Sequence, residues 1–175
     1  MDKEGLKAAM THDIETPVQA IDCTIYVMPA FATLEVADLE ASKRWYTAGL
    51  GFIVLAELPG PGGAPGLVHL RRWHHQDLLL VPARGGPEAA RGTGVRLSFA
   101  AGDEDLNAIA QRASGLAGGW VEGPMATPWQ TIDLVCHDPD GYVVVFTGRD
   151  LSRPPDPQRA AELQAAVERA RYGVA

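Results

Sequence analysis

The sequence contains the same order of structural elements twice, and this repeat limits the possible folds more than any other feature of the 175-residue chain. Two loops rich in glycine and proline, at 59–66 and 84–92, divide the chain, and the second separates the stretches 29–83 and 93–149. Each stretch predicts the order β-α-β-β-β. Because neither unit covers its own sheet, the two are expected to pair around a concave cleft, giving an α+β fold of two βαβββ modules.

Alternating apolar residues and helix caps locate the elements of each module. We expect the strands 31–36, 51–55, 67–70 and 77–81 in the first module, and 95–99, 117–122, 131–136 and 142–147 in the second. Asp38 is expected to cap a helix over 39–50, and Asp103 or Asp105 to cap the helix of the second module.

The two ends of the chain lie outside the repeat. Residues 1–28 are expected to form an N-terminal arm that is partly disordered and that ends in a strand-like segment. Residues 150–175 are expected to form a C-terminal helix, capped by Asp156. Its thin apolar stripe, which includes Leu163 and Val167, predicts docking on the body or on a partner chain.

The composition argues against several classes of function. The net charge of −7 argues against binding to nucleic acid or to an anionic membrane. No segment has the roughly 18 apolar residues that are needed to span a bilayer, and the N-terminus lacks the pattern of a signal peptide. Cys23 and Cys136 are far apart and form neither a disulfide framework nor a metal-ligand spacing. A cytoplasmic protein with reduced cysteines is therefore expected.

Two motifs resemble a known family. The first helix contains Asp-Leu-Glu-Ala-Ser-Lys-Arg-Trp-Tyr at 38–46, and the last hairpin contains Thr-Pro-Trp-Gln-Thr at 127–131 and Asp-Pro-Asp-Gly at 138–141. These motifs resemble the glyoxalase/bleomycin-resistance/dioxygenase superfamily, also called vicinal oxygen chelate proteins, over about 29–149. They are most similar to its bleomycin-resistance branch. The resemblance implies a clamp of two βαβββ modules, often completed in a dimer, and either a metal enzyme or a metal-free antibiotic binder.

The metal-ligand positions that the resemblance implies hold unsuitable residues. These positions fall on Phe31, Gly94, Val145 and either Leu79 or Leu80. None of these side chains offers a lone pair to a divalent cation, so we expect no metal and no cofactor. His69, His74 and His75 are close together in sequence, but we favour a solvated hairpin turn for this segment over a metal site.

The same alignment predicts residues that line a binding cleft. A ring at Phe31 would point into the cleft, and strand alternation would send Thr33 and Glu35 the same way. Val145 would bring Val143 with it. The segment 123–129 would border the opening, and Trp120 fits the core as well as the cleft. The predicted ligand-binding residues are Phe31, Thr33, Glu35, Trp120, Met125, Trp129, Val143 and Val145; the family motif places Trp129 in the cleft.

The leading hypothesis from the sequence is a metal-free protein that sequesters an aromatic or cationic natural product and has no catalytic residues. The alternative is a lyase or dioxygenase of the same superfamily that uses non-standard ligands, such as His69 and its neighbours, or none. A third possibility is an interaction module. A homodimer is expected, in which the N-terminal arm lies along the partner's sheet or folds back on its own chain.

Overall fold

The computed structural model describes residues 28, 30–84, 91–154 and 156–172. The predicted N-terminal arm, Cys23 and most of the 84–92 linker therefore lie outside the described residues. Within the described residues, no helix is both long enough and apolar enough to cross a membrane.

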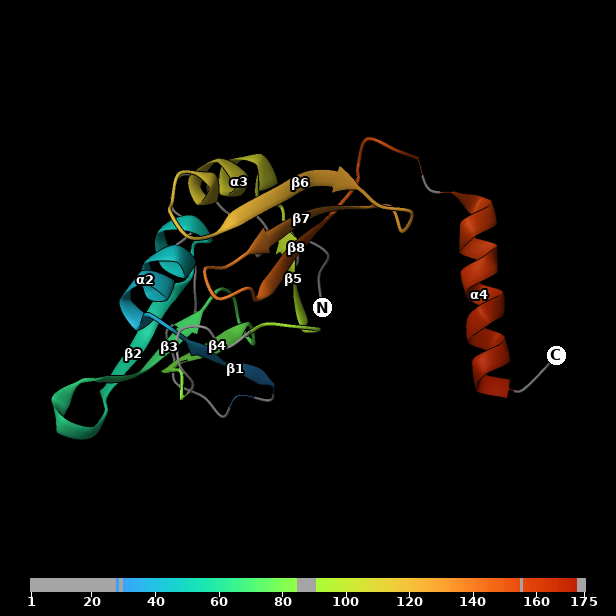
Figure 1. Ribbon diagram of the computed structural model, residues 1–175. Coiled ribbons are helices and arrows are strands. Elements are labelled where there is room, and N and C mark those ends of the chain that lie inside the picture. The colour runs from blue at the N-terminus through green and yellow to red at the C-terminus, as the bar shows by residue number, and fades with distance from the viewer. Residues whose placement is uncertain (1–27, 29, 85–90, 155, 173–175) are drawn as a thin grey trace, which may run out of the picture.

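Both modules have the predicted βαβββ order (Figure 1). The first contains β1 (Phe31–Val36), α2 (Leu39–Arg44) with a π-helical turn η2 (Trp45–Gly49), β2 (Ile53–Pro59), a 3₁₀ turn (Pro61–Gly63), β3 (Pro65–Arg71) and β4 (Asp77–Pro82). The second contains β5 (Arg96–Gly102), α3 (Leu106–Ser114), β6 (Trp120–Ala126), β7 (Thr131–His137) and β8 (Val143–Arg149). The helix α4 (Pro157–Tyr172) follows.

The two sheets have equivalent topologies. The strand order is β1-β4-β3-β2 in the first sheet and β5-β8-β7-β6 in the second. The pairs β1–β4 and β5–β8 are parallel, because a helix connects β1 or β5 to the next strand of its module. The remaining pairs are antiparallel. The repeat that the sequence predicts is therefore confirmed as an α+β fold.

Aspartate caps fix where the two module helices begin. Asp38 Oδ1 accepts a hydrogen bond from the backbone N–H of Ala41 at 2.9 Å. In the second module Asp105, and not Asp103, is the cap, and it accepts from the N–H of Asn107 at 2.8 Å. Each cap satisfies a backbone donor that has no partner within the helix.

The helix-covered faces of both sheets contribute to one hydrophobic core. Trp45, Tyr46 and Phe52 of the first module are buried in it, as is Phe146 of the second. The Phe52 ring meets Phe99 edge-on at a centroid distance of 5.8 Å, which joins the two modules. Each sheet therefore has a second face, directed away from this shared core, which we call its open face.

The turn of the first module between β3 and β4 docks on the second module. The Arg72 guanidinium is fully buried and pairs with Glu104, which also accepts a hydrogen bond from Trp73 Nε1 at 2.9 Å. Burial lowers the pKa of Arg72, and the nearby Glu104 carboxylate opposes this effect. Gln76 adds a hydrogen bond to the carbonyl of Ala100 at 3.3 Å.

The equivalent turn of the second module docks on the first. Tyr46 OH donates to Asp138 Oδ2 at 2.9 Å, and Ser42 Oγ donates to Asp140 Oδ2 at 3.2 Å. Burial raises the pKa of Asp138 to about 6 and raises that of Tyr46 well above its ordinary value. The modules are thus joined by two reciprocal turns.

Several element boundaries differ from the prediction. The strands β2 and β3 extend into the loop that was expected over 59–66, because only the short 3₁₀ turn separates them. The strand β6 continues to Ala126, although 123–126 was expected to be loop. A register shift between Glu122 and Met125 lets the β6–β7 pairing continue past Gly123 and Pro124.

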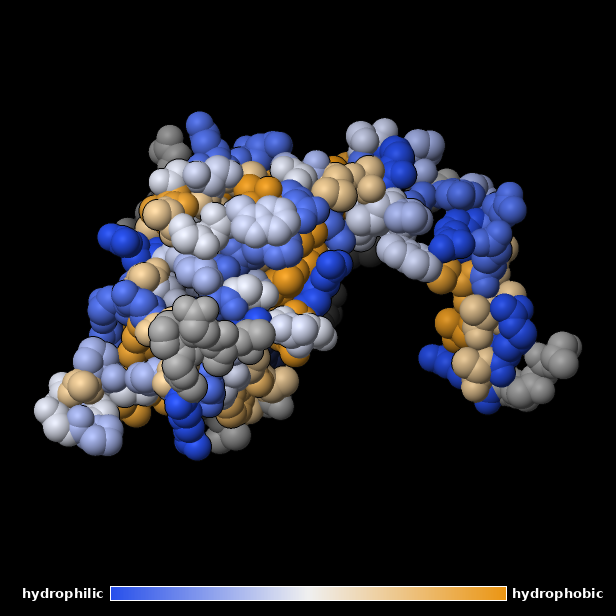
Figure 2. All heavy atoms as spheres, in the orientation of Figure 1, coloured by the Kyte–Doolittle hydropathy of each residue, from blue (hydrophilic) through white to orange (hydrophobic). Residues whose placement is uncertain are grey.

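The helix α4 has the predicted cap but covers Pro157–Tyr172 within the expected range 150–175, and it does not dock along the body. Asp156 Oδ1 accepts hydrogen bonds from the N–H groups of Gln158 and Arg159. Figure 1 shows α4 standing apart from both sheets, and Figure 2 shows apolar residues along it beside the open space. Leu163 and Val167 are both nearly half exposed. Docking on the body is therefore wrong for most of α4, and docking on a partner stays a prediction.

Candidate functional site

The open face of the first sheet carries the three predicted residues of β1. Leu34 and Val36 are buried in the core, whereas Phe31, Thr33 and Glu35 alternate with them and are exposed. Half of the Phe31 surface is accessible, and Phe31 lies at the start of β1, which is an edge strand of its sheet. The predicted alternation is confirmed, and it leaves an aromatic ring on the open face.

A polar cluster lies beside Phe31 on the same face. Strand register pairs Phe31 with Asp77, and Asp77 with Arg71. The Asp77 carboxylate accepts a hydrogen bond from Arg71 Nε at 2.9 Å and lies 2.8 Å from His69 Nε2. His69 is therefore held by a carboxylate within the sheet.

The other two histidines are not brought to this cluster. His74 and His75 are exposed in the β3–β4 turn, where their ring centroids are 3.9 Å apart. The solvated-turn interpretation is thus confirmed for both residues.

The positions that metal-dependent relatives use hold side chains that cannot bind a metal. Phe31 and Leu79 lie on the open face of the first sheet, Val145 lies on that of the second, and Gly94 lies in a turn before β5. Among the residues that the structure describes, no three His, Cys, Asp or Glu side chains lie close enough to hold a metal ion. The residues present therefore do not fit the metal site that the family resemblance implies.

The open face of the second sheet brings four predicted residues together. Leu134, Cys136 and Val144 point into the core, so their neighbours along each strand point the opposite way. Residues paired across strands share a face, and the pairing gives three rows. The rows are Trp120–His137–Val143–Arg96, Glu122–Val135–Val145–Ser98 and Met125–Asp133–Thr147–Ala100. Trp120, Met125, Val143 and Val145 therefore lie on one face of the sheet, although Val145 itself is buried and only 2% exposed.

Trp120 is stacked on its neighbour in the first row. Its indole lies parallel to the His137 imidazole, with centroids 3.7 Å apart and an interplanar angle of 4°. Trp120 remains 52% exposed. His137 Nε2 is also 3.4 Å from Glu122 Oε1, beyond the usual length of a hydrogen bond. The sequence had left Trp120 open between core and cleft, and the structure places it on the open face.

Trp129 occupies the turn between β6 and β7, and a residue from the far end of the chain covers it. The Arg159 guanidinium of α4 lies 4.4 Å from the ring centroid, a cation–π distance. The backbone N–H of Trp129 donates to Thr127 Oγ1 at 3.1 Å, which shapes the turn. Trp129 is 60% exposed, so one side of the ring remains accessible.

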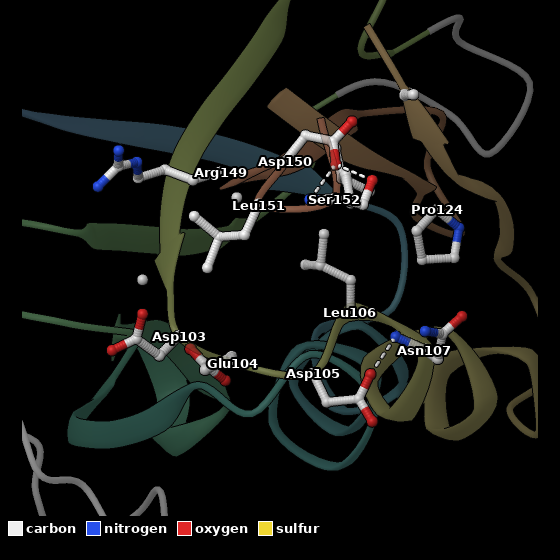
Figure 3. Close-up of a pocket in the computed structure, with 14 residues that line it drawn as sticks. Asp103, Glu104, Asp105, Leu106, Asn107, Pro124, Arg149, Asp150, Leu151 and Ser152 are labelled. Atoms are coloured by element: carbon white, nitrogen blue, oxygen red, sulfur yellow. Dashed lines mark hydrogen bonds between the residues drawn. The ribbon is translucent and has the colours of Figure 1, made fainter. Parts of the chain in front are cut away.

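A pocket of about 590 Å³ lies elsewhere, between the start of α3 and the segment after β8 (Figure 3). None of the eight predicted residues lines it. Leu106 and Leu151 point into its opening. Two carboxylates of its rim already have partners, because Glu104 pairs with Arg72 and Asp150 is bound by Ser152 and Arg153. Asp103, Asn107 and Arg149 also line the pocket, so it retains polar groups that a ligand could contact.

The sequence analysis missed two residues of the open face. Neither His137, which directly precedes the turn at 138–141, nor Glu122 is among the predicted ligand-binding residues. Both could have been found by aligning the β6–β7 hairpin about its turn, because this alignment pairs Trp120 with His137. Cys136, in contrast, is buried, and burial raises its pKa to about 12, which excludes it as a reactive thiol.

Comparisons with known proteins agree with this architecture. A family model described as Glyoxalase/Bleomycin resistance protein/Dioxygenase superfamily matches residues 29–146. No curated protein matches the sequence.

Solved structures with the same fold include two proteins from Streptomyces sp. CB03234. A glyoxalase/bleomycin resistance protein is 29% identical, with a TM-score of 0.50, over 66% of this chain and 96% of its own. TnmS3, an antibiotic binding protein, is 27% identical, with a TM-score of 0.51, over 72% of this chain and 97% of its own. A glyoxalase-related enzyme from Fulvimarina pelagi, 21% identical, shares the fold with a TM-score of 0.54, over 72% of this chain and 89% of its own.

Proposed function

Because the chain belongs to the glyoxalase/bleomycin resistance protein/dioxygenase superfamily, we propose that it binds a small aromatic natural product of the antibiotic type and sequesters it in the cytoplasm. One observation carries this proposal: the open faces and their margin expose several large apolar side chains, three of them aromatic. Phe31, Trp120, Met125 and Trp129 are each about half exposed. Such side chains are stabilised when a ligand covers them.

The chemistry of these faces suits binding better than catalysis. A drug-sized ligand needs an apolar, aromatic surface and a few polar groups, and the open faces offer both. Catalysis needs a metal, a nucleophile or a free acid–base pair. The metal positions hold hydrocarbon side chains or glycine, and Asp138, whose pKa is raised to about 6, is hydrogen-bonded in the contact between the modules. TnmS3, whose printed description is an antibiotic binding protein, supports the same assignment.

One observation favours the alternative, a lyase or dioxygenase of the same superfamily. His69 and Asp77 are 2.8 Å apart on the open face of the first sheet, and a carboxylate can orient an imidazole for proton transfer. Elemental analysis of the purified protein separates the two functions. Stoichiometric Fe, Mn, Ni or Zn would favour the enzyme, and the binding proposal expects none.

We also propose that the protein acts as a homodimer. The open faces are directed away from the shared core, and Phe31, Trp120 and Met125 on them are about half exposed in a single chain. A second copy, related by a twofold axis, would place an open face of one chain against that of the other and so form two equivalent clefts.

A thermal-shift screen tests the proposed function. The full chain is heated with a panel of aromatic antibiotics, and binding by the folded state raises the melting temperature further as the concentration of the compound increases. We expect at least one compound to do so, and also to quench tryptophan fluorescence and to protect a sensitive bacterium that expresses the protein. A panel without any hit would contradict the proposal. If a compound binds to the protein but the cells degrade the compound instead of retaining it unchanged, sequestration would be contradicted.

A further inference from the structure

We propose that Trp120, supported from below by His137, is the main stacking platform of this protein, and that Glu122 makes the platform selective for flat ring systems with a positive charge. This inference rests on the proposed function and deepens it by naming the class of ligand. It also assigns roles to His137 and Glu122, which the sequence did not predict to bind.

The stacking geometry leaves one face of the indole available. The 3.7 Å centroid distance and the 4° angle mean that the His137 imidazole lies flat against one face of Trp120. The 52% exposure then belongs mainly to the opposite face and the ring edge. An aromatic ligand could therefore lie on Trp120 as a third layer in the same stack, and offset stacking of this kind stabilises aromatic pairs.

The platform is also held in place before a ligand arrives. Trp120 and His137 face each other on adjacent strands, and β7 is paired on both sides, by β6 and β8. A rigid ring loses little conformational entropy when it binds. Trp129 differs, because it lies in a turn and its covering residue, Arg159, comes from a helix that stands apart from the body. We therefore expect Trp129 to contribute less than Trp120.

The charges around the platform favour a cation. Glu122 lies on the same face two residues along β6, and about half of its side chain is exposed. Asp133 lies in the row of Met125 and accepts hydrogen bonds from Thr131 and Thr147. Its carboxylate is therefore a second negative charge on this face. Arg96 is three strands away in the row, roughly 14 Å at about 4.8 Å per strand. A cationic ring on Trp120 would gain both a cation–π contact and a nearby carboxylate.

Calorimetric titration with two probes of the same shape tests the inference. Proflavine is a flat three-ring cation, and 9-anthracenecarboxylate is a flat three-ring anion. We expect the full chain to bind proflavine at least tenfold more tightly than the anion. Trp120→Ala should weaken proflavine binding at least tenfold, Trp120→Phe less, and Trp129→Ala less than threefold. Glu122→Gln should reduce the preference for the cation without weakening binding of the anion.

A separate pair of variants tests His137 as a positioning residue. His137→Ala removes the ring beneath the indole and should weaken proflavine binding severalfold and shift the fluorescence of Trp120. His137→Phe restores a flat ring and should restore affinity, a rescue that loss of general stability would not produce. Leu151→Ala is the matched control, because Leu151 is exposed in the pocket of Figure 3, away from the open face, and proflavine affinity should not change.

The possible outcomes separate this inference from the proposed function. If the chain binds proflavine and Trp120→Ala binds it equally well, the platform is wrong, although the protein is still an aromatic binder. If the anion binds as tightly as the cation, the charge selection is wrong. If Leu151→Ala weakens binding and Trp120→Ala does not, the ligand occupies the other pocket, which also overturns the platform. If neither probe nor any antibiotic of the panel binds, both this inference and the proposed function are refuted.

Discussion

Asp138 should make the stability of the fold fall as the pH rises, which is the opposite of what a salt-bridged carboxylate does. Its carboxyl is 3% exposed, and this burial raises its pKa to about 6, although hydrogen bonds from Tyr46 OH and the backbone N–H of Tyr142 favour the charged form. In the unfolded chain the same carboxyl is expected to titrate at about 3.9.

The size of the effect follows from these two values. Between about pH 4 and pH 6 the folded chain keeps a proton that the unfolded chain has lost, so the free energy of unfolding decreases as the pH rises. The gap of about 2 pKa units, at 1.36 kcal/mol per unit, corresponds to about 3 kcal/mol. This contribution is fully present below about pH 4 and is lost once the pH has passed about 6.

Asp138→Asn isolates the contribution of this group. An asparagine keeps an oxygen that accepts from the N–H groups of Asp140 and Tyr142, but it cannot ionise. Urea unfolding of both proteins is followed by circular dichroism at about pH 4, 5, 6 and 7, at low protein concentration because the pI is about 5.1. From the lowest to the highest pH, the stability of the variant relative to the wild type should rise by about 3 kcal/mol.

A second variant checks the cause of the shift. Tyr46→Phe keeps the Asp138 carboxyl but removes the hydroxyl that stabilises its charged form, so the pKa of Asp138 should rise further. The loss of stability should then continue to a higher pH than in the wild type. The argument from burial is refuted if the difference between wild type and Asp138→Asn stays constant with pH, or if it changes in the opposite direction.

Three further outcomes are expected. Gly119→Ala should lower the free energy of unfolding by about 1–3 kcal/mol, because its Cβ would lie closer than 3.0 Å to the Trp45 indole; an unchanged melting temperature would contradict this contact. Phe31→His combined with Val145→Glu should not create submicromolar affinity for Zn²⁺ or Ni²⁺ in calorimetry, because two ligands without their supporting shell rarely hold a metal. If the proposed dimer exchanges its N-terminal arms, deletion of 1–28 should leave a monomer in light scattering; a truncated dimer with the same melting temperature would exclude arm exchange, and a full-length monomer at high micromolar concentration would exclude the dimer.

The order and type of the elements could be predicted from the sequence because local signals agree with the global fold. The alternation in β1 places Leu34 and Val36 in the core, and Asp38 caps α2 as expected. The end of β6 could not be predicted in the same way. A glycine followed by Pro124 normally indicates a break, but the register shift after Glu122 lets the strand continue.

The candidate site could be predicted only in part, because a strand pattern identifies the face of a residue but not its neighbours. Thr33, Glu35 and Val143 follow from alternation once the family alignment has placed Phe31 and Val145. The stacking of Trp120 on His137 depends on hairpin register, and the contact of Arg159 with Trp129 depends on where α4 lies. No local pattern contains the second contact, because 30 positions separate the two residues in the chain.

The reciprocal turns between the modules have a consequence for how the chain reaches its folded state. Tyr46 and Asp138 are 92 positions apart, and Glu35 and Tyr142, whose hydroxyl contacts the Glu35 backbone, are 107 apart. Contacts this distant in sequence require large loops to close, which slows folding. During synthesis, the first module leaves the ribosome before Glu104 and Asp138 exist, so Arg72 stays in water until the second module arrives. We therefore expect the two halves to fold as one cooperative unit, late and only after nearly the whole chain has emerged.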